Sequence, residues 1–230
     1  MLEQPAFLLH RRPYRETSLL ASFITPEQGR VDLVVKGVRS TSRRARQRQA
    51  WLQPFVPLTL RWRPRPGGRL STLYQFEAVG GGVALRHMGL LCGLYANELL
   101  QRTLTEGEPV EALFERYVRT LETLAQTAQP AQQAWALRQL EWALLEVLGS
   151  QPPLPPEGAT ALIWEASGWR AAVDGVPAPC VLALAEGCFE PACLAAQKRL
   201  LRQLLAPWLG GRPMESQRLL ARFLERSAES

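Results

Sequence analysis

Short alternations of apolar and polar residues fill the first 80 residues and predict a β domain. Thr25-Pro26-Glu27-Gln28-Gly29 has the composition of a tight turn, with proline near its start and glycine at its end, and Pro66-Gly67-Gly68 forms a second such break. No segment of this region shows a convincing helical period. Five short strands within about 80 residues are typical of a small closed barrel. The predicted strands are 7–10, 17–24, 31–38, 55–62 and 70–79.

The pattern changes after Gly80-Gly81-Gly82, where we place a domain boundary. Beyond it, leucines recur three or four residues apart, which is the spacing of one buried helix face. Segment 150–193 interrupts this pattern, because Pro152-Pro153-Leu154-Pro155-Pro156 cannot be helical throughout. The fold class is therefore α+β, with a barrel over 1–80 and a mainly helical domain over 81–230 that contains an irregular, proline-rich insertion near 150–193. The predicted helices are 83–100, 110–125, 134–148, 194–209 and 216–224.

Several classes of protein are disfavoured by composition. No apolar run approaches the roughly 20 residues that span a bilayer, and the first residues do not have the long apolar stretch of a secretory signal. We therefore expect a cytoplasmic protein with no membrane partner. The four cysteines, Cys92, Cys180, Cys188 and Cys193, do not have the close pairing of zinc ribbons. We interpret them as reduced thiols, with a disulfide or a metal site as the alternatives.

The distribution of charge points to a polyanionic partner. Residues 1–80 contain 14 Lys and Arg against 5 Asp and Glu, whereas residues 81–230 contain 13 against 16. The excess positive charge thus lies entirely in the predicted barrel. Almost all of these cations are arginines, whose planar guanidinium group suits phosphate and can stack on bases.

One segment concentrates this charge. Between Lys36 and Arg48, six cations occur within thirteen residues: Lys36, Arg39, Arg43, Arg44, Arg46 and Arg48. Small polar residues separate the preceding strand from the arginines, so we expect a mobile loop beside the barrel. Such a loop can neutralise several phosphates and release their condensed counterions. The alternative is an ordinary solvated loop.

Aromatic residues are interleaved with these cations, as single-strand binding requires. Most aromatics of a small barrel fill its core, so we expect only a few to face a ligand. Tyr14 and Trp51 are the strongest candidates, because each lies near arginines in a predicted loop. Arg61 and Arg63 alternate around Trp62, which places both on one face of a strand. That face either extends the basic surface or is simply solvated.

Enzymatic chemistry finds little support in the sequence. Asp32 and Asp174 are the only aspartates, and His10 and His87 the only histidines, whereas metal-dependent nucleases need clustered acidic ligands. No phosphate-binding loop of the G-x-x-x-x-G-K-[ST] type and no G-x-S-x-G elbow occurs. We therefore expect no catalytic residues, no metal and no cofactor.

An ordered set of segments resembles the RecO family of bacterial recombination mediators, although no single one is specific. The matches are Arg12–Leu19, Phe23–Thr25 with Gly29-Arg30, Val35–Arg39, Gln53–Leu58, Gly93–Leu100, Ala136–Glu141 and Leu209–Ser216. They occur in family order and span most of the chain; only about 150–195 looks unlike the family. Some family members have a four-cysteine zinc module in the later part of the chain, for which the cysteine spacing here is wrong.

The resemblance implies an OB-fold barrel followed by a helical domain. It also implies binding to single-stranded and double-stranded DNA, annealing of strands coated by single-strand binding protein (SSB), and loading of RecA together with RecR at the nucleoid. An RNA-binding OB-fold module with a helical docking domain is the alternative. The expected nucleic-acid-binding residues are Arg12, Tyr14, Arg30, Lys36, Arg39, Arg43, Arg44, Arg46, Arg48 and Trp51.

The family also binds the acidic, Phe-ending C-terminal tail of SSB on its helical domain. Arg138 falls at the motif position that would pair with carboxylates of this tail. A helix face with Leu137, Leu140 and Leu144 would receive the apolar end of the tail. The alternative for Arg138 is an ion pair with Glu141, one helical turn farther on.

Overall fold

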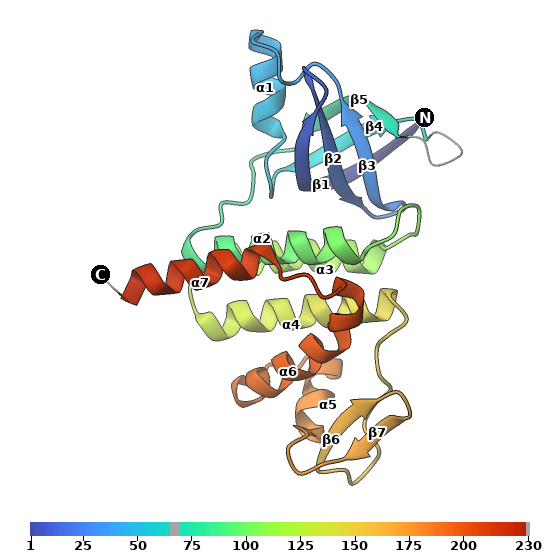
Figure 1. Ribbon diagram of the computed structural model, residues 1–230, viewed down its shortest axis with the longest axis vertical. Helices are drawn as coiled ribbons and strands as arrows, with labels where there is room; N and C mark the ends of the chain where they lie inside the picture. Colours follow the sequence, from blue (N-terminus) through green and yellow to red (C-terminus); the bar gives the residue numbers. More distant parts are fainter. Residues whose placement is uncertain (65–69, 229–230) are drawn as a thin grey trace.

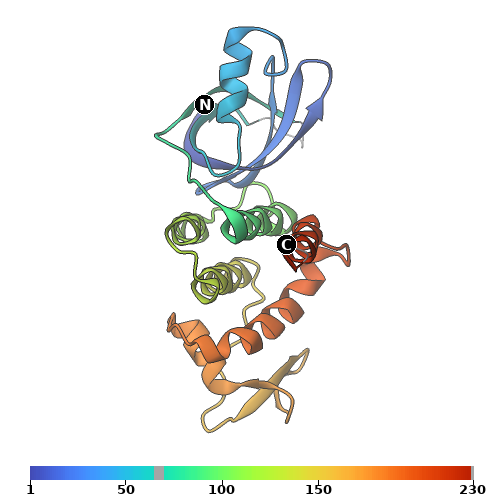
Figure 2. The same cartoon turned by 90° about the vertical axis from the view of Figure 1, so that its left-hand side faces the viewer.

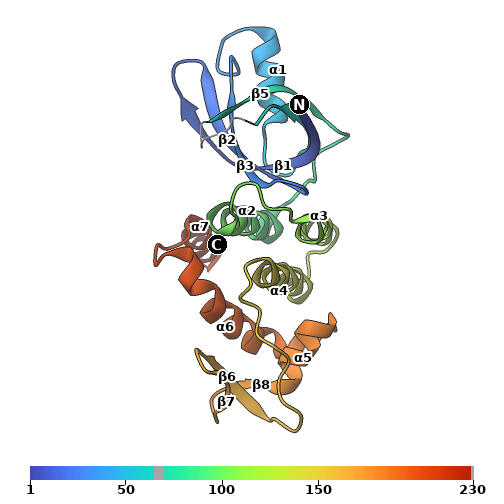
Figure 3. The ribbon, with the colours of Figure 1, turned by 90° about the vertical axis from the view of Figure 1, so that its right-hand side faces the viewer.

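The computed structural model describes residues 1–64 and 70–228, apart from the side chains of Arg44 and of residues 224–228. Figure 1 shows three tiers: a β-barrel, a layer of long helices beneath it, and a small sheet with shorter helices at the far end. The turned views in Figures 2 and 3 show the same order along the long axis. The barrel and the small sheet therefore lie at opposite ends of the molecule.

The N-terminal tier is a closed five-stranded barrel of the OB type. Around the barrel the strands follow the order β1-β2-β3-β5-β4, and all neighbours are antiparallel except β3 and β5. A helix lies between β3 and β4 in the chain. The fold class predicted from the sequence is thus confirmed. The elements are β1 (Leu2–Tyr14), β2 (Ser18–Thr25), β3 (Gly29–Val35), α1 (Arg43–Trp51), β4 (Pro57–Trp62) and β5 (Ser71–Ala78).

Inward-facing apolar side chains, which alternate with outward-facing ones along each strand, fill the barrel. Leu8, Phe23, Leu33 and Leu60 are each at most 1% exposed and form its core with other inward-facing residues. The turn predicted at 25–29 joins β2 to β3, and Gly29 adopts the positive φ that the end of this turn requires. The predicted strands are therefore present, although β1 is much longer than the apolar run that predicted it.

Segment 43–51 is a helix, so the predicted mobile loop is wrong at these residues. Ser42 caps α1, because its side chain accepts a hydrogen bond from the backbone N–H of Ala45 at 3.1 Å. Ala45 is 2% exposed and Leu52 is fully buried, so both fix the helix to the barrel. Arginine, glutamine and alanine are good helix formers, but one small apolar residue among so many cations gave no visible period.

Long helices form the middle tier, as the leucine spacing predicts. They are α2 (His87–Thr103), α3 (Glu111–Gln126) and α4 (Pro130–Val147). Leu99, Tyr117 and Leu140 are fully buried where these helices meet. Among the helices of the described residues, none alone is long and apolar enough to cross a membrane, although Ala178–Glu186 and Pro191–Leu209, joined by a sharp bend, pass that test together.

The segment predicted as an irregular insertion is ordered. Its strands form a small antiparallel sheet in the order β7-β6-β8, in which Trp164 and Trp169 face each other across β6 and β7 with ring centroids 5.1 Å apart. Cross-strand aromatic pairs of this kind stabilise a short hairpin. The elements are β6 (Ala161–Glu165), β7 (Gly168–Ala171), β8 (Val176–Pro177), α5 (Ala178–Glu186), the 3₁₀ turns Pro191–Cys193 and Ala206–Leu209, α6 (Leu194–Leu205) and α7 (Glu215–Ala228).

A disulfide joins Cys180 and Cys193, so the prediction of reduced thiols is wrong for this pair. It ties α5 to the residue that precedes α6. Spacing along the chain could not reveal the pair, because 13 residues and a helix end separate the two cysteines. Cys92 and Cys188 are free, and no group of ligands that could hold a metal occurs among the described residues.

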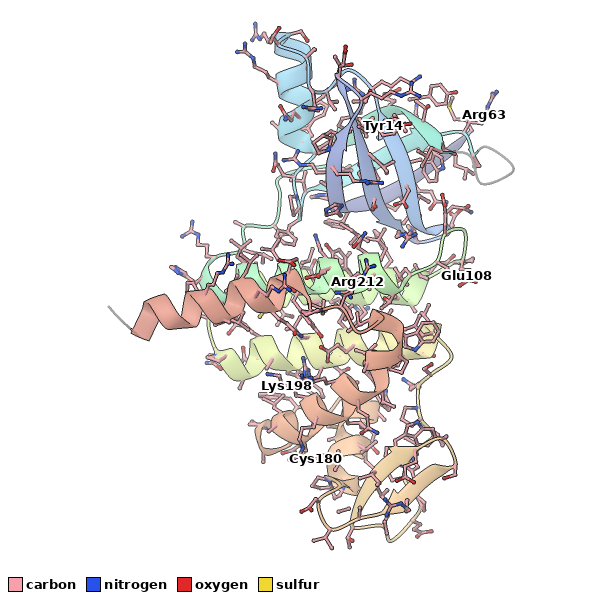
Figure 4. All side chains as sticks on the ribbon, in the orientation of Figure 1. Tyr14, Arg63, Glu108, Cys180, Lys198 and Arg212 are labelled. Atoms are coloured by element: carbon pink, nitrogen blue, oxygen red, sulfur yellow. A yellow bond between two sulfur atoms is a disulfide. The ribbon has the colours of Figure 1, made fainter. Side chains whose placement is uncertain are left out.

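The barrel and the helices share one hydrophobic cluster. Phe7 of β1 lies 5.4 Å from Tyr117 of α3 between ring centroids. Asn97 of α2 is buried at this junction; it donates a hydrogen bond to the carbonyl of Leu8 and accepts one from the Tyr117 hydroxyl. Figure 4 shows Glu108 at the connection between α2 and α3, directly beneath the barrel. These contacts fix the orientation of the basic barrel relative to the helices.

Candidate nucleic-acid interface

Cations from three separate segments meet at the end of the barrel that carries α1. The backbone N–H of Arg39 bonds to the carbonyl of Thr17, and its guanidinium donates to the carbonyl of Arg15 at 3.1 Å. The guanidinium of Arg48 donates to the carbonyl of Lys36 at 3.2 Å. These bonds bring the β1–β2 turn, the turn after β3 and α1 together. The α1 basic surface comprises Arg15, Lys36, Arg39, Arg43, Arg46 and Arg48.

The arginines of α1 divide between two roles. Arg43 and Arg46, one helical turn apart, are exposed. Arg48 is partly buried, with its guanidinium 4.8 Å from the ring centre of Phe76. No acidic residue occurs anywhere in segment 36–52. Cations at a helix N-terminus oppose the helix dipole, so α1 carries a local electrostatic cost that a bound anion would remove.

The two predicted stacking residues differ in accessibility. Tyr14 is half-buried, and the Arg15 guanidinium lies 5.3 Å from its ring centre. Trp51, also half-buried, meets the ring of Phe76 edge-on at 6.3 Å and packs against the barrel core. Trp51 thus holds the end of α1 to the barrel. Both rings border the α1 basic surface, but neither presents a fully open face to it.

Arg30 lies at the opposite end of the barrel from the α1 basic surface. Its guanidinium donates to the carbonyl of Gln101 in α2 at 2.9 Å and lies 3.6 Å from Asp32. Arg30 is near the start of β3 and Lys36 directly follows its end, so the length of the strand separates them, roughly 20 Å. Arg30 therefore joins the barrel to the helices and is not part of the α1 basic surface. Arg12, two residues before Tyr14, is exposed on β1.

Arg61 on β4 and Arg63, which directly follows the strand, are both exposed. The Arg61 guanidinium is 2.5 Å from Glu3, whose hydrogen bond and negative charge raise the pKa of Arg61. Figure 4 shows Arg63 projecting away from the barrel. Arg65 and Arg69 lie outside the described residues. The Arg44 side chain is not described either, although its backbone is part of α1.

A second candidate site is a cavity of about 320 Å³ between the helices. Its apolar wall comes from α2, α4, α6, α7 and the turn after α6, and its charged wall includes Arg138, Lys198 and Arg202. Figure 4 shows Lys198 on α6, toward α4. The cavity joins an apolar recess to a cationic rim. We call it the inter-helix pocket; its apolar residues are Met88, Leu91, Leu137, Leu205, Leu209 and Leu220.

Arg138 forms a buried ion pair with Glu141 at 2.8 Å, the arrangement that the i,i+3 spacing offered as the alternative. The Tyr95 hydroxyl donates to the same carboxylate at 2.5 Å. Burial raises the pKa of Glu141, although the charge of Arg138 acts in the opposite direction. Burial, together with Glu141, also raises the pKa of Tyr95. Arg138 and Glu141 line the pocket, so this pair both stabilises α4 and gives the pocket polarity.

The predicted leucine face needs a correction. Leu140 and Leu144 are completely buried in the core and do not line the inter-helix pocket, whereas Leu137 does. The sequence did not point to Lys198 and Arg202, because they come from a helix about 60 residues away. Only the packing of α6 on α4 brings them beside Arg138.

The last wall of the pocket is α7, which is held by two residues of α2. The Glu98 carboxylate accepts hydrogen bonds from the backbone N–H of Glu215 and from the N–H and hydroxyl of Ser216, at 2.7–2.9 Å. Arg102 donates to the carbonyls of Leu209, Arg212 and Pro213. Burial favours a raised pKa for Glu98, but the bonds from Ser216 and Glu215 outweigh it and lower the pKa. Glu98 therefore caps α7 from a neighbouring helix.

Comparison with known proteins identifies the family. The N-terminal family model of recombination protein O matches residues 1–81, and the C-terminal model matches residues 89–227. The chain belongs to the RecO family. The DNA repair protein RecO of Nitrosococcus oceani is 43% identical over 94% of this chain and 92% of its own length. The RecO proteins of Sodalis glossinidius (40%; 99% and 90%) and Pseudomonas aeruginosa (38%; 94% and 93%) are similar over the same extent.

Membership confirms the resemblance seen in the sequence. A RecO-family protein is a DNA repair protein and a recombination mediator. The OB-like barrel with its α1 basic surface and the helical tier with its pocket are thus features of a DNA repair protein.

Proposed function

We propose that this RecO-family protein binds single-stranded and double-stranded DNA on the α1 basic surface and anneals complementary strands. The observation that carries the proposal is the meeting of cations from three chain segments beside an acid-free helix. Arg39, Arg43 and Arg46 would hold one strand by its phosphates, which leaves its bases free to pair. Neutralised phosphates repel an incoming complementary strand less, so annealing needs no covalent step and no catalytic residue.

The inter-helix pocket is our proposed docking site for the C-terminal tail of SSB. The tail is acidic and ends in an aromatic residue, and the pocket offers an apolar recess beside Arg138, Lys198 and Arg202. Docking would bring the protein to SSB-coated strands. In the cytoplasm, at the nucleoid, the protein would then help RecR to load RecA.

Charge removal on α1 tests the DNA-binding proposal. We expect the variant with Arg39, Arg43 and Arg46 changed to Gln to bind a single-stranded oligonucleotide more weakly and with a flatter salt dependence. Each lost phosphate contact lowers the slope of log affinity against log salt by about 0.7 for a single strand. Arg48 is left unchanged, because it also packs on Phe76. Fluorescence anisotropy at several salt concentrations measures both quantities.

The matched control is Arg119→Gln, an exposed arginine of α3 in the helical tier. Unchanged affinity and slope in the triple variant would exclude α1 as the contact. Competition with RNA of the same sequence tests the alternative, an RNA-binding module. A clear preference for RNA would mean that RNA, not DNA, is the ligand.

Charge removal on α6 tests tail docking. Lys198→Ala with Arg202→Ala should weaken binding of an acidic, Phe-ending peptide and slow annealing of SSB-coated strands, yet leave annealing of naked strands unchanged. Both side chains are exposed, so neither change opens a cavity in the core. Arg199→Ala, an exposed cation of the same helix that does not line the pocket, is the control. Equal losses on naked and coated strands would contradict two separate sites.

A further inference from the structure

Tyr74 occupies an unusual place on the barrel surface. Along the pair of β4 and β5, Arg61 faces Gln75 and Trp62 faces Leu73, so Tyr74 is the additional residue of a β-bulge. Because of the bulge, Tyr74 and Gln75 both point outward, while Leu73 and Phe76 on either side are buried. The Tyr74 side chain is 55% exposed. Without the bulge, alternation would place only one of Tyr74 and Gln75 on the outer face. The bulge thus exposes the large Tyr74 ring to solvent.

This ring lies at the margin of the α1 basic surface. In the parallel pair of β3 and β5, Leu33 faces Ser71 and Val34 faces Thr72. Lys36, in the turn after β3, and Tyr74 on β5 each lie two residues beyond this last pair. Two residues on from Tyr74, the ring of Phe76 lies 4.8 Å from the Arg48 guanidinium. The carbonyl of Lys36 accepts from Arg48. Phosphates held on the α1 basic surface would therefore lie close to the Tyr74 ring.

We propose that Tyr74 is a stacking platform for an unpaired base of single-stranded DNA. The inference rests on the proposed binding of DNA to the α1 basic surface and adds to it the contact that distinguishes single from double strands. Guanidinium groups bind the phosphates of either form, whereas a ring can stack only on a base that is out of the duplex. Tyr14 and Trp51 serve this purpose less well, because Arg15 and the barrel respectively cover part of each ring.

Substitution of Tyr74 tests the inference on the full-length protein. We expect Tyr74→Ala and Tyr74→Leu to bind a single-stranded oligothymidylate about tenfold more weakly, since stacking on one aromatic is worth on the order of a tenfold change or more. Tyr74→Phe keeps the ring and should bind as the unmodified protein does. Affinity for a duplex of equal length and the slope of the salt dependence should stay unchanged in all three variants. The side chain is exposed, so unfolding midpoints should also be unchanged.

Two controls separate this inference from the function on which it rests. Phe189→Ala removes an exposed ring of the helical part and should have no effect. An oligonucleotide of abasic residues keeps the phosphates but offers nothing to stack, so Tyr74→Ala should bind it as tightly as the unmodified protein does. Stacking would be overturned if Tyr74→Phe lost as much affinity as Tyr74→Ala. It would also be overturned if Tyr74→Ala lost as much affinity for the duplex as for the single strand. If Tyr74→Ala has no effect while the α1 triple variant loses affinity, the stacking proposal fails and the DNA-binding proposal stands.

Discussion

At the scale of single residues, Arg138 shows how burial changes the role of a charge. Its side chain is 9% exposed and that of its partner Glu141 is 2% exposed, so each is the main neutralising group of the other. The sequence motif pointed to Arg138 as a ligand for a carboxylate, and the structure shows that Glu141 already occupies one edge of its guanidinium. Loss of Arg138 would therefore affect folding as well as any ligand, and the exposed Lys198 and Arg202 are better probes of the pocket.

Arg138→Ala should lower the free energy of unfolding by about 3–5 kcal/mol, because it leaves a buried carboxylate unpaired. At low pH the Glu141 carboxyl is protonated and neutral in both the folded and the unfolded protein, so the loss of Arg138 costs little there. The pKa of Glu141 is raised in the folded protein. The destabilisation should thus grow as the pH rises through the pKa of Glu141 in the folded state. Urea unfolding at several pH values measures it. Arg138→Met combined with Glu141→Gln, which keeps an acceptor for Tyr95, should recover most of the loss; no recovery would contradict the ion-pair explanation.

At the scale of elements, the sequence predicted periodic structure well and missed structure stabilised by contacts between distant segments. The leucine spacing predicted α2, α3 and α4, and the composition of residues 25–29 predicted their turn. These predictions succeeded because one face of each helix or strand is apolar. Helix α1 was missed, since its main buried anchors, Ala45 and the following Leu52, stand among exposed arginines. The sheet within 150–193 was also missed, because its strands are only two to five residues long.

The candidate sites differ in the same way: one could be predicted from neighbouring residues in the sequence, and the others depend on contacts between distant segments. The charge run from Lys36 to Arg48 could be read directly from the sequence, because its cations are close in the chain. By contrast, the inter-helix pocket draws on residues from Met88 to Leu220, and the bulge at Tyr74 depends on strand register. Arg30 was misplaced for a related reason: its hydrogen bond to the carbonyl of Gln101 forms only because β3 and α2 pack together.

The Glu98 cap on α7 gives a prediction for this element. Glu98→Gln should loosen α7 and weaken binding of an acidic peptide in the inter-helix pocket, because the bonds to Glu215 and Ser216 lose their charged acceptor. Glu98 has a lowered pKa, so its stabilising contribution is present above the unfolded value of about 4.5 and is lost as the pH falls through the folded value. Hydrogen exchange of the α7 amides measures the loosening. Glu215→Gln removes a neighbouring exposed carboxylate and serves as the control; protection of α7 that does not change with Glu98→Gln would refute the cap.

At the scale of the whole molecule, the α1 basic surface and the inter-helix pocket are held in one rigid arrangement. Each offers positive charge to a negatively charged partner. Helix α1 lies at the upper end of the molecule in Figure 1, and the inter-helix pocket is lined by helices of the middle and lower parts, α2, α4, α6 and α7. A buried contact of Asn97 and a partly buried contact of Arg30 join the two parts. A protein partner bound at the pocket would therefore be held at a fixed direction relative to DNA bound at the barrel.

Asn97→Ala should uncouple these parts. The change leaves the carbonyl of Leu8 and the hydroxyl of Tyr117 without their buried partner, at a cost of about 1–3 kcal/mol for each group. Calorimetry should show one unfolding transition for the native protein and two for the variant, because the barrel and the helices lose a bond that links their stabilities. Tyr117→Phe removes only one of the two hydrogen bonds and should keep a single transition at a slightly lower temperature. One undivided transition in the Asn97 variant would mean that the hydrophobic contact of Phe7 with Tyr117 is sufficient to hold the two parts together.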